Sequence, residues 1–245
     1  MVLVGVVARN RMPHEESRAE RAPRVTILES VKRHPRQMLL AIGVAFGYST
    51  LAYIGTIFTM TYAEERGYGY TESLLLQVAG SIAFTLAVPA MATLSDRRGR
   101  KPVVILGTLA YAGFFFVYFP LVDGHVLGLA TLAYVLVSVL MAAPQGCIPA
   151  FLGEQFPAAT PYSSISATYQ TGAALGGGTA ATAATALFIA YDNNPIGVGL
   201  YSAAAALVLV LCAWGLRETF RVPTAELGLG AAVSEPRRTP DTTTV

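Results

Sequence analysis

Six long stretches of apolar residues, separated by short polar connections, dominate the chain from residue 38 onward. A helix needs roughly 20 apolar residues to cross a bilayer core about 30 Å thick, and each stretch reaches that length. The stretches are Met38–Tyr62, Ser73–Leu94, Pro102–Val122, Val126–Leu152, Tyr162–Tyr191 and Pro195–Leu216, and none contains Asp, Glu, Lys, Arg or His. Strands of an outer-membrane barrel would alternate polar and apolar residues. The continuous runs therefore predict an all-α polytopic membrane protein with six transmembrane helices.

The composition supports this prediction and excludes several soluble classes. Of the 245 residues, 53% are hydrophobic and 13% are charged, and the mean hydropathy is +0.51. Soluble domains carry roughly 25% charged residues, so a cytosolic enzyme or a disordered scaffold is a poor fit. The net charge of +2 gives no argument for a nucleic-acid partner. Cys147 and Cys212 lie in apolar runs without metal-ligand spacing, so we expect buried thiols, no metal and no cofactor.

The distribution of Lys and Arg predicts the orientation of the chain. Sixteen of the 17 basic residues lie before the first stretch, between the second and third, or after the sixth, and Arg66 alone lies on the opposite side. Lys and Arg accumulate on the cytoplasmic side of a membrane. We therefore expect both termini to be cytoplasmic, in a bacterial cytoplasmic membrane. The expected parts are a basic cytoplasmic segment (1–37), a transmembrane unit (38–217) and a disordered cytoplasmic tail (218–245).

The connection between the second and third stretches carries the most specific motif. Residues 92–102 have the sequence A-T-L-S-D-R-R-G-R-K-P, in which Gly99 permits a tight turn and Pro102 suits the first turn of a helix. The order D-R-x-G-R-K resembles the loop signature of the major facilitator superfamily, with Ala92 in place of the first glycine. His34-Pro35-Arg36 and the E-x-F-P pattern that begins at Glu154 resemble its metabolite:H⁺ symporter branch, although basic residues expected after E-x-F-P are replaced by Ala159 and Pro161.

This resemblance implies a fold and a function. It implies the C-terminal half of a twelve-helix carrier, built from two inverted three-helix repeats, whose N-terminal six-helix half is missing from this chain. It implies that the first, second, fourth and fifth helices line a solute cavity and that the third and sixth face lipid. A cytoplasmic gating loop is expected to form a latch, with Glu154 meeting Arg97 or Arg100. Its candidate residues are Asp96, Arg97, Gly99, Arg100, Lys101 and Glu154.

Polar and glycine residues inside the apolar stretches are the remaining candidates. An amide or phenol in lipid must face a cavity or another helix, because burying it without a partner costs several kcal/mol. The candidate solute ligands, for which helix-to-helix hydrogen bonding is the alternative, are Tyr48, Tyr53, Gln77, Gln145, Tyr169 and Gln170. A run of small residues lets helices approach closely. The candidate packing glycines are Gly172, Gly176, Gly177 and Gly178.

The expected function is transport of a small organic acid or a zwitterionic osmolyte by alternating access, coupled to protons. Proton coupling normally needs a carboxylate or histidine within the membrane, so the proton site is expected in the other half. A truncated remnant or assembly partner that transports nothing is an alternative, as is half of a sugar or drug carrier. No nucleophile–base pair, zinc motif or phosphate-binding loop lies at membrane depth, so an enzyme is not expected.

Overall fold

The computed structural model describes residues 35–156 and 162–218, with only the backbone described at 162–164. These residues form six helices that are long and apolar enough to cross a membrane, and this confirms the predicted fold class. The first span consists of α4 (Pro35–Tyr53), the π-helical turn η1 (Ile54–Phe58) and α5 (Thr59–Glu65) in one continuous helix. The other five are α6 (Tyr70–Arg98), α7 (Arg100–Asp123), α8 (Leu127–Gly153), α9 (Tyr162–Ala190) and α10 (Ile196–Gly215).

The polar connection expected between Leu94 and Pro102 is helical except at one residue. Helix α6 continues to Arg98 and α7 begins at Arg100, so only Gly99 lies between the two helices. Its φ is 101°, a value that a residue with a side chain adopts only under strain. A single glycine therefore reverses the chain, and the expectation of a longer loop is wrong. Asp96 and Arg97 lie in the last turn of α6, and Lys101 lies in the first turn of α7.

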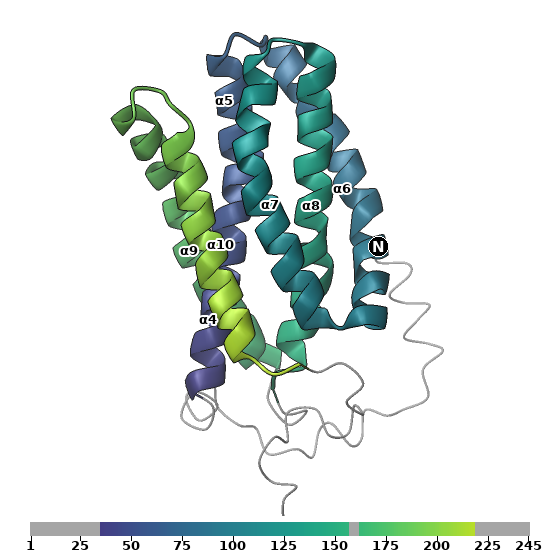
Figure 1. The fold of residues 1–245 in the computed structure, drawn as a ribbon. Helices are drawn as coiled ribbons and strands as arrows, with labels where there is room; N and C mark the ends of the chain where they lie inside the picture. Colours follow the sequence, from purple (N-terminus) through teal and green to yellow (C-terminus); the bar gives the residue numbers. More distant parts are fainter. Residues whose placement is uncertain (1–34, 157–161, 219–245) are drawn as a thin grey trace, which may run out of the picture.

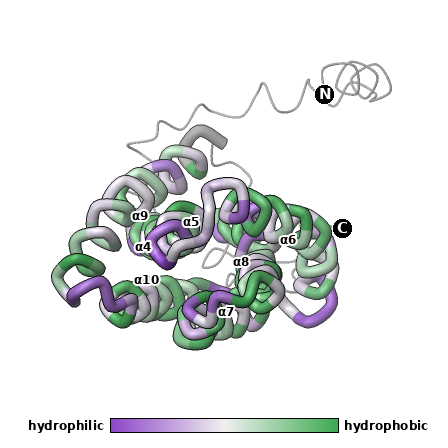
Figure 2. The backbone as a smooth tube through the Cα atoms, turned by 90° about the horizontal axis from the view of Figure 1, so that it is seen from above, coloured by the Kyte–Doolittle hydropathy of each residue, from purple (hydrophilic) through white to green (hydrophobic). Residues whose placement is uncertain are grey.

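The six spans form two groups of three. One group contains α4, α9 and α10 and the other contains α6, α7 and α8, and α7 packs against α10 where the groups meet (Figures 1 and 2). The first three spans correspond in order to the last three: α4 to α8, α6 to α9 and α7 to α10. Under this correspondence the α4–α9 pair becomes the α8–α6 pair, and the α4–α10 pair becomes the α8–α7 pair. Because the first and fourth spans run in opposite directions, this pattern has the symmetry of two inverted three-helix repeats.

The core at the end of the bundle where α5 lies is aromatic. Phe58 and Tyr62 meet Phe119 of α7 and Phe188 of α9, with ring centroids 5.0–6.4 Å apart and mostly edge to face. Such geometry is favoured because the electropositive edge of one ring meets the electron-rich face of another. These contacts join α5 to both groups of helices. The start of helix α4 and the end of helix α10 lie at the opposite end of the bundle (Figure 1).

The predicted terminal segments lie largely outside the described residues. Of segment 1–37, residues 35–37 are described, and they form the first turn of α4. Of segment 218–245, residue 218 is described. Pro161, noted for its place in the E-x-F-P region, also lies outside the described residues, together with the rest of 157–161. The expected cytoplasmic position of both segments and the expected disorder of 218–245 stay predictions.

Candidate functional site

A cavity of about 260 Å³ opens between the first, second and fourth spans. Its wall is neutral: among the described residues that line it, none carries a charge. It contains hydroxyl and amide groups together with three aromatic rings. The lining residues are Tyr48, Ala52, Gly55, Thr56, Gln77, Ser81, Phe84, Tyr111, Val137, Ser138 and Met141. We call this the central cavity.

Three of the six candidate solute ligands meet at or beside the central cavity. Tyr48 of α4 and Gln77 of α6 line it. The Tyr48 hydroxyl donates a hydrogen bond to the Gln145 side-chain carbonyl of α8. This bond joins α4 to α8 and leaves the Gln145 amide hydrogens for another acceptor.

The other three candidates lie apart from the central cavity. Tyr169 and Gln170 line a second cavity of about 400 Å³ between α8 and α9, whose wall includes Pro149 and Leu152. The Tyr53 side chain is 42% exposed, and its ring lies against Gly177 of α9. The structure thus divides the six residues between two cavities and a helix–helix contact.

Tyr111 reaches the central cavity from the third span, which was expected to face lipid. Its hydroxyl donates to the Leu51 carbonyl oxygen over 2.9 Å. The side chain fits because Gly55 faces it, and a Cβ at Gly55 would overlap the Tyr111 hydroxyl oxygen. The expectation for the third span is therefore wrong at this residue. The sequence contained one usable signal, a tyrosine that needs a buried partner for its hydroxyl.

The charged residues where α6 ends and α7 begins form a cluster with the end of α8. Arg100 Nη2 lies 2.8 Å from Glu154 Oε1 and 3.4 Å from Asp96 Oδ1. The Arg100 and Glu154 side chains are about one-fifth exposed, whereas Asp96 is 61% exposed. Of the two arginines considered as partners for Glu154, the structure brings Arg100 to it. Arg97 lies exposed at the end of α6.

Lys101 and Glu218 join this cluster to the end of α10, which the sequence did not predict. Lys101 Nζ donates to the carbonyl oxygens of Trp214 and Leu216 over 2.6 and 3.0 Å. The Glu218 carboxylate accepts the backbone N–H groups of Arg100 and Lys101. A cation thus satisfies carbonyls at a helix C-terminus and an anion satisfies N–H groups at a helix N-terminus, as the helix dipole favours.

The glycines of α9 differ in their surroundings. A Cβ at Gly172 would lie 2.5 Å from the Ile42 carbonyl oxygen of α4, and one at Gly176 would overlap the Phe46 carbonyl oxygen. Gly177 faces Tyr53, as described above. Gly178 has no described heavy atom within 4 Å of its Cβ position. Two residues of helix turn the chain by about 200°, so Gly178 points away from the α4 contact that Gly176 makes.

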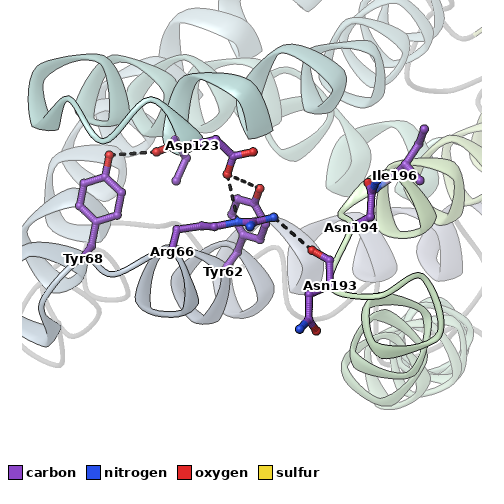
Figure 3. Close-up of polar contacts among 8 residues, drawn as sticks. Tyr62, Arg66, Tyr68, Asp123, Asn193, Asn194 and Ile196 are labelled. Carbon is purple, nitrogen blue, oxygen red and sulfur yellow. Dashed lines mark hydrogen bonds and ion pairs between the residues drawn. The ribbon is translucent and has the colours of Figure 1, made fainter.

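A second polar cluster lies at the opposite end of the bundle (Figure 3). The Asp123 carboxylate of α7 accepts a hydrogen bond from the Tyr62 hydroxyl over 2.6 Å and pairs with Arg66 Nε at 3.0 Å. Arg66 also donates to the Asn193 carbonyl oxygen over 3.1 Å, and its guanidinium lies 4.9 Å from the centre of the Tyr62 ring. The cluster connects α5, α7 and the turn between α9 and α10. For Arg66, the sequence predicted only its side of the membrane.

Tyr68 lies beside this second cluster. Its hydroxyl donates to the Val122 carbonyl oxygen over 3.0 Å (Figure 3). Burial raises the pKa of Tyr68, and the negative charges of Glu72 and Asp123 raise it further, because all three disfavour the phenolate. Tyr68 therefore stays a neutral hydrogen-bond donor at physiological pH. In the described part of the chain, no three His, Cys, Asp or Glu residues come together as a metal site.

Comparison with known proteins decides the family. The family model of the Major Facilitator Superfamily matches residues 1–181 and again residues 40–234. The chain belongs to the Major Facilitator Superfamily. The prediction from the D-R-x-G-R-K motif is thereby confirmed. The chain is accordingly a multi-pass membrane protein of this superfamily, and its six spans have the architecture of one half of the fold.

Relatives within the superfamily are transporters of small metabolites. The chain is 27% identical over 163 residues to the proline/betaine transporter of Salmonella typhimurium, covering 66% of this chain and 33% of that protein. It is 25% identical to the glycine betaine/proline/ectoine/pipecolic acid transporter of Dickeya dadantii, covering 82% and 40%. It is 27% identical to the shikimate transporter of Escherichia coli, covering 81% and 46%. The chain thus spans less than half the length of these relatives.

Proposed function

We propose that this chain forms the C-terminal half of a carrier that moves a small organic acid or a zwitterionic osmolyte by alternating access. The central cavity is the observation that carries this proposal. It lies between three spans, and its volume of about 260 Å³ is below the range of about 300–1,000 Å³ typical of drug-sized ligand sites. A small solute fits such a wall, and a second, N-terminal half would enclose it.

The chemistry of the cavity wall favours a zwitterion over a net anion. A net charge held in a neutral wall would be poorly compensated, whereas a zwitterion brings both charges itself. The rings of Tyr48, Phe84 and Tyr111 offer electron-rich surfaces to an ammonium group. Gln77 and the nearby serine hydroxyls offer donors to a carboxylate. Two of the relatives are named for proline and betaine, which are solutes of this chemistry.

We further propose that transport is coupled to protons and that the proton site lies in the other half. The six apolar stretches of this chain contain no carboxylate or histidine. A proton carried across the membrane normally needs such a group at depth. The coupling step therefore belongs to residues outside these six apolar stretches, and this half contributes solute contacts and gating.

The cluster of Asp96, Arg100 and Glu154 is proposed as the latch of the cytoplasmic side. The bias of basic residues toward this end supports a cytoplasmic position and cytoplasmic termini. The Arg100–Glu154 pair ties the start of α7 to the end of α8, and Lys101 ties the start of α7 to the end of α10. In the outward-facing state this network would hold three helix ends together and close the cytoplasmic side.

Uptake by vesicles tests the proposal. The vesicles contain the full carrier, that is, this chain together with the proposed N-terminal half. Radiolabelled betaine, proline and shikimate are offered with and without a pH gradient. We expect uptake of the zwitterions, and the variant Gln77→Leu should raise their KM roughly tenfold or more, since a hydrogen bond to a charged group contributes about 1.5–3 kcal/mol. Thr93→Val, a polar-to-apolar change at an exposed site of the same helix, is the control and should leave KM unchanged. Uptake of shikimate alone would contradict the zwitterion assignment, and uptake of none would contradict transport of this solute class.

A further inference from the structure

The first span contains a π-helical turn beside the central cavity. The Thr59 N–H bonds to the Ile54 carbonyl oxygen, five residues back, where an α-helix would use a partner four residues back. This widened turn, η1, supplies Gly55 and Thr56 to the cavity wall, and Ala52 precedes it. Single π turns inside α-helices are uncommon and frequently occur at functional sites.

Hydroxyl groups donate to backbone carbonyls within η1 and on both sides of it. Two are tyrosines from other spans: Tyr111 of α7 bonds the Leu51 carbonyl over 2.9 Å, and Tyr134 of α8 bonds the Thr59 carbonyl over 2.5 Å. Within the span, Thr56 bonds the Ala52 carbonyl and Thr59 bonds the Gly55 carbonyl. A side-chain donor compensates a carbonyl whose bond in the helical ladder is weakened. The shape of η1 is thus held by the surrounding spans as well as by its own backbone.

Tyr111 and Gly55 fit each other in a way that depends on the hydroxyl. A Cβ at Gly55 would overlap the Tyr111 hydroxyl oxygen, but its distance to the ring carbon that carries this oxygen would be 3.2 Å. The clash would therefore fall mainly on the hydroxyl. Because both residues line the central cavity, any displacement of the hydroxyl changes the cavity wall and releases the Leu51 carbonyl.

The two sides of η1 are held by different parts of the molecule. Below it, α4 packs along α9 and α10. Above it, the contacts of the Tyr62 ring with Phe119 and Phe188 and the bond from Tyr62 to Asp123 hold α5 against α7 and α9. Bending of the first span would therefore concentrate at η1, where the ladder is weakest.

We propose that Tyr111 is a positioning residue for solute binding: by holding the Leu51 carbonyl in the last turn of α4, just before η1, it sets the shape of the central cavity. This rests on the proposed transport function. Tyr134 holds the other end of η1 but does not line the cavity. Tyr111 therefore affects solute affinity as well as stability, whereas Tyr134 affects stability.

The test compares Gly55→Ala, Tyr111→Phe and the double variant in the full carrier. Gly55→Ala should reduce betaine or proline uptake about tenfold or more, because overpacking of this kind costs about 1–3 kcal/mol. The double variant should recover to within about threefold of Tyr111→Phe alone, since the clashing hydroxyl is gone. Gly113→Ala is the control glycine, because no heavy atom of the described residues lies within 4 Å of its Cβ position, and it should leave uptake unchanged.

The second comparison separates positioning from stability. Tyr111→Phe should raise the KM for the zwitterion about threefold to tenfold. Tyr134→Phe should lower the melting temperature about as much as Tyr111→Phe does, but it should not raise KM. Equal KM effects of the two tyrosine variants, or a double variant no better than Gly55→Ala, would overturn the proposal. If the unaltered carrier moves no solute, the proposed function fails and the positioning role fails with it. The fit of Tyr111 to Gly55 is still measured then, because Tyr111→Phe must also rescue the melting temperature of Gly55→Ala.

Discussion

The contact between α9 and α4 allows a test with two glycines that lie two residues apart. Gly176 faces the backbone of α4, and an added Cβ would overlap the Phe46 carbonyl oxygen. Gly178 lies in the same helix, and no described heavy atom is within 4 Å of its Cβ position. Replacing each by alanine adds the same methyl group to the same helix. The two variants differ in what the methyl group meets.

The expected magnitude follows from two opposing effects. Alanine is favoured over glycine inside a helix by about 1 kcal/mol, and this gain applies to both variants. Overpacking a tight contact costs about 1–3 kcal/mol, and the cost applies only at Gly176, where the neighbour is backbone and cannot turn aside. Gly176→Ala should therefore be about 1–3 kcal/mol less stable than Gly178→Ala.

Thermal melting in detergent measures this difference. For a chain of this size, 1 kcal/mol corresponds to about 2–4 °C, so Gly176→Ala should melt roughly 2–12 °C below Gly178→Ala. The amount of each variant inserted in the membrane is measured alongside, because both should insert equally. Equal melting temperatures, or a lower one for Gly178→Ala, would refute the close approach of α9 to α4.

Two further predictions concern the polar clusters at the two ends of the bundle. Neutralising Glu154 (Glu154→Gln) should reduce uptake by the full carrier more than Asp96→Asn, because Glu154 lies closer to Arg100 and is less exposed; equal uptake by the two variants would contradict the proposed latch. Asp123→Ala should lower stability by about 1–3 kcal/mol, since it removes the acceptor of the Tyr62 hydroxyl. Glu65→Ala removes an exposed carboxylate at the end of α5 and should change the melting temperature little, so equal melting of these two variants would contradict a structural role for Asp123.

The helices were predictable because their signal is local. Each span is a continuous apolar run long enough to cross a bilayer, and the backbone in lipid must satisfy its own hydrogen bonds. The ends were less predictable: α6 runs on through Arg98 because charged residues at a helix end extend into the headgroup region and water. The motif around Asp96 and the later Glu154 identified one cluster, and the structure brings these residues together at Arg100.

The features that the sequence missed depend on contacts between distant segments. Tyr111 is one of 12 tyrosines, and its partner is a carbonyl 60 residues away in another span. Arg66 and Asp123 lie 57 positions apart and pair because α5 and α7 end at the same level. The π turn has no composition of its own: its residues Ile54–Phe58 belong to an ordinary apolar run.

The sequence by itself determined six spans, their alternation across the membrane and the family, because chain length, hydrophobicity and the D-R-x-G-R-K motif are properties of contiguous residues. The tertiary structure decided which polar groups share a cavity and which glycines touch a neighbour. It also decided where the first span departs from α-helical geometry. These depend on how each helix is rotated and paired, and inside a uniformly apolar bundle the hydrophobic pattern does not specify rotation, since lipid and protein interior are equally apolar.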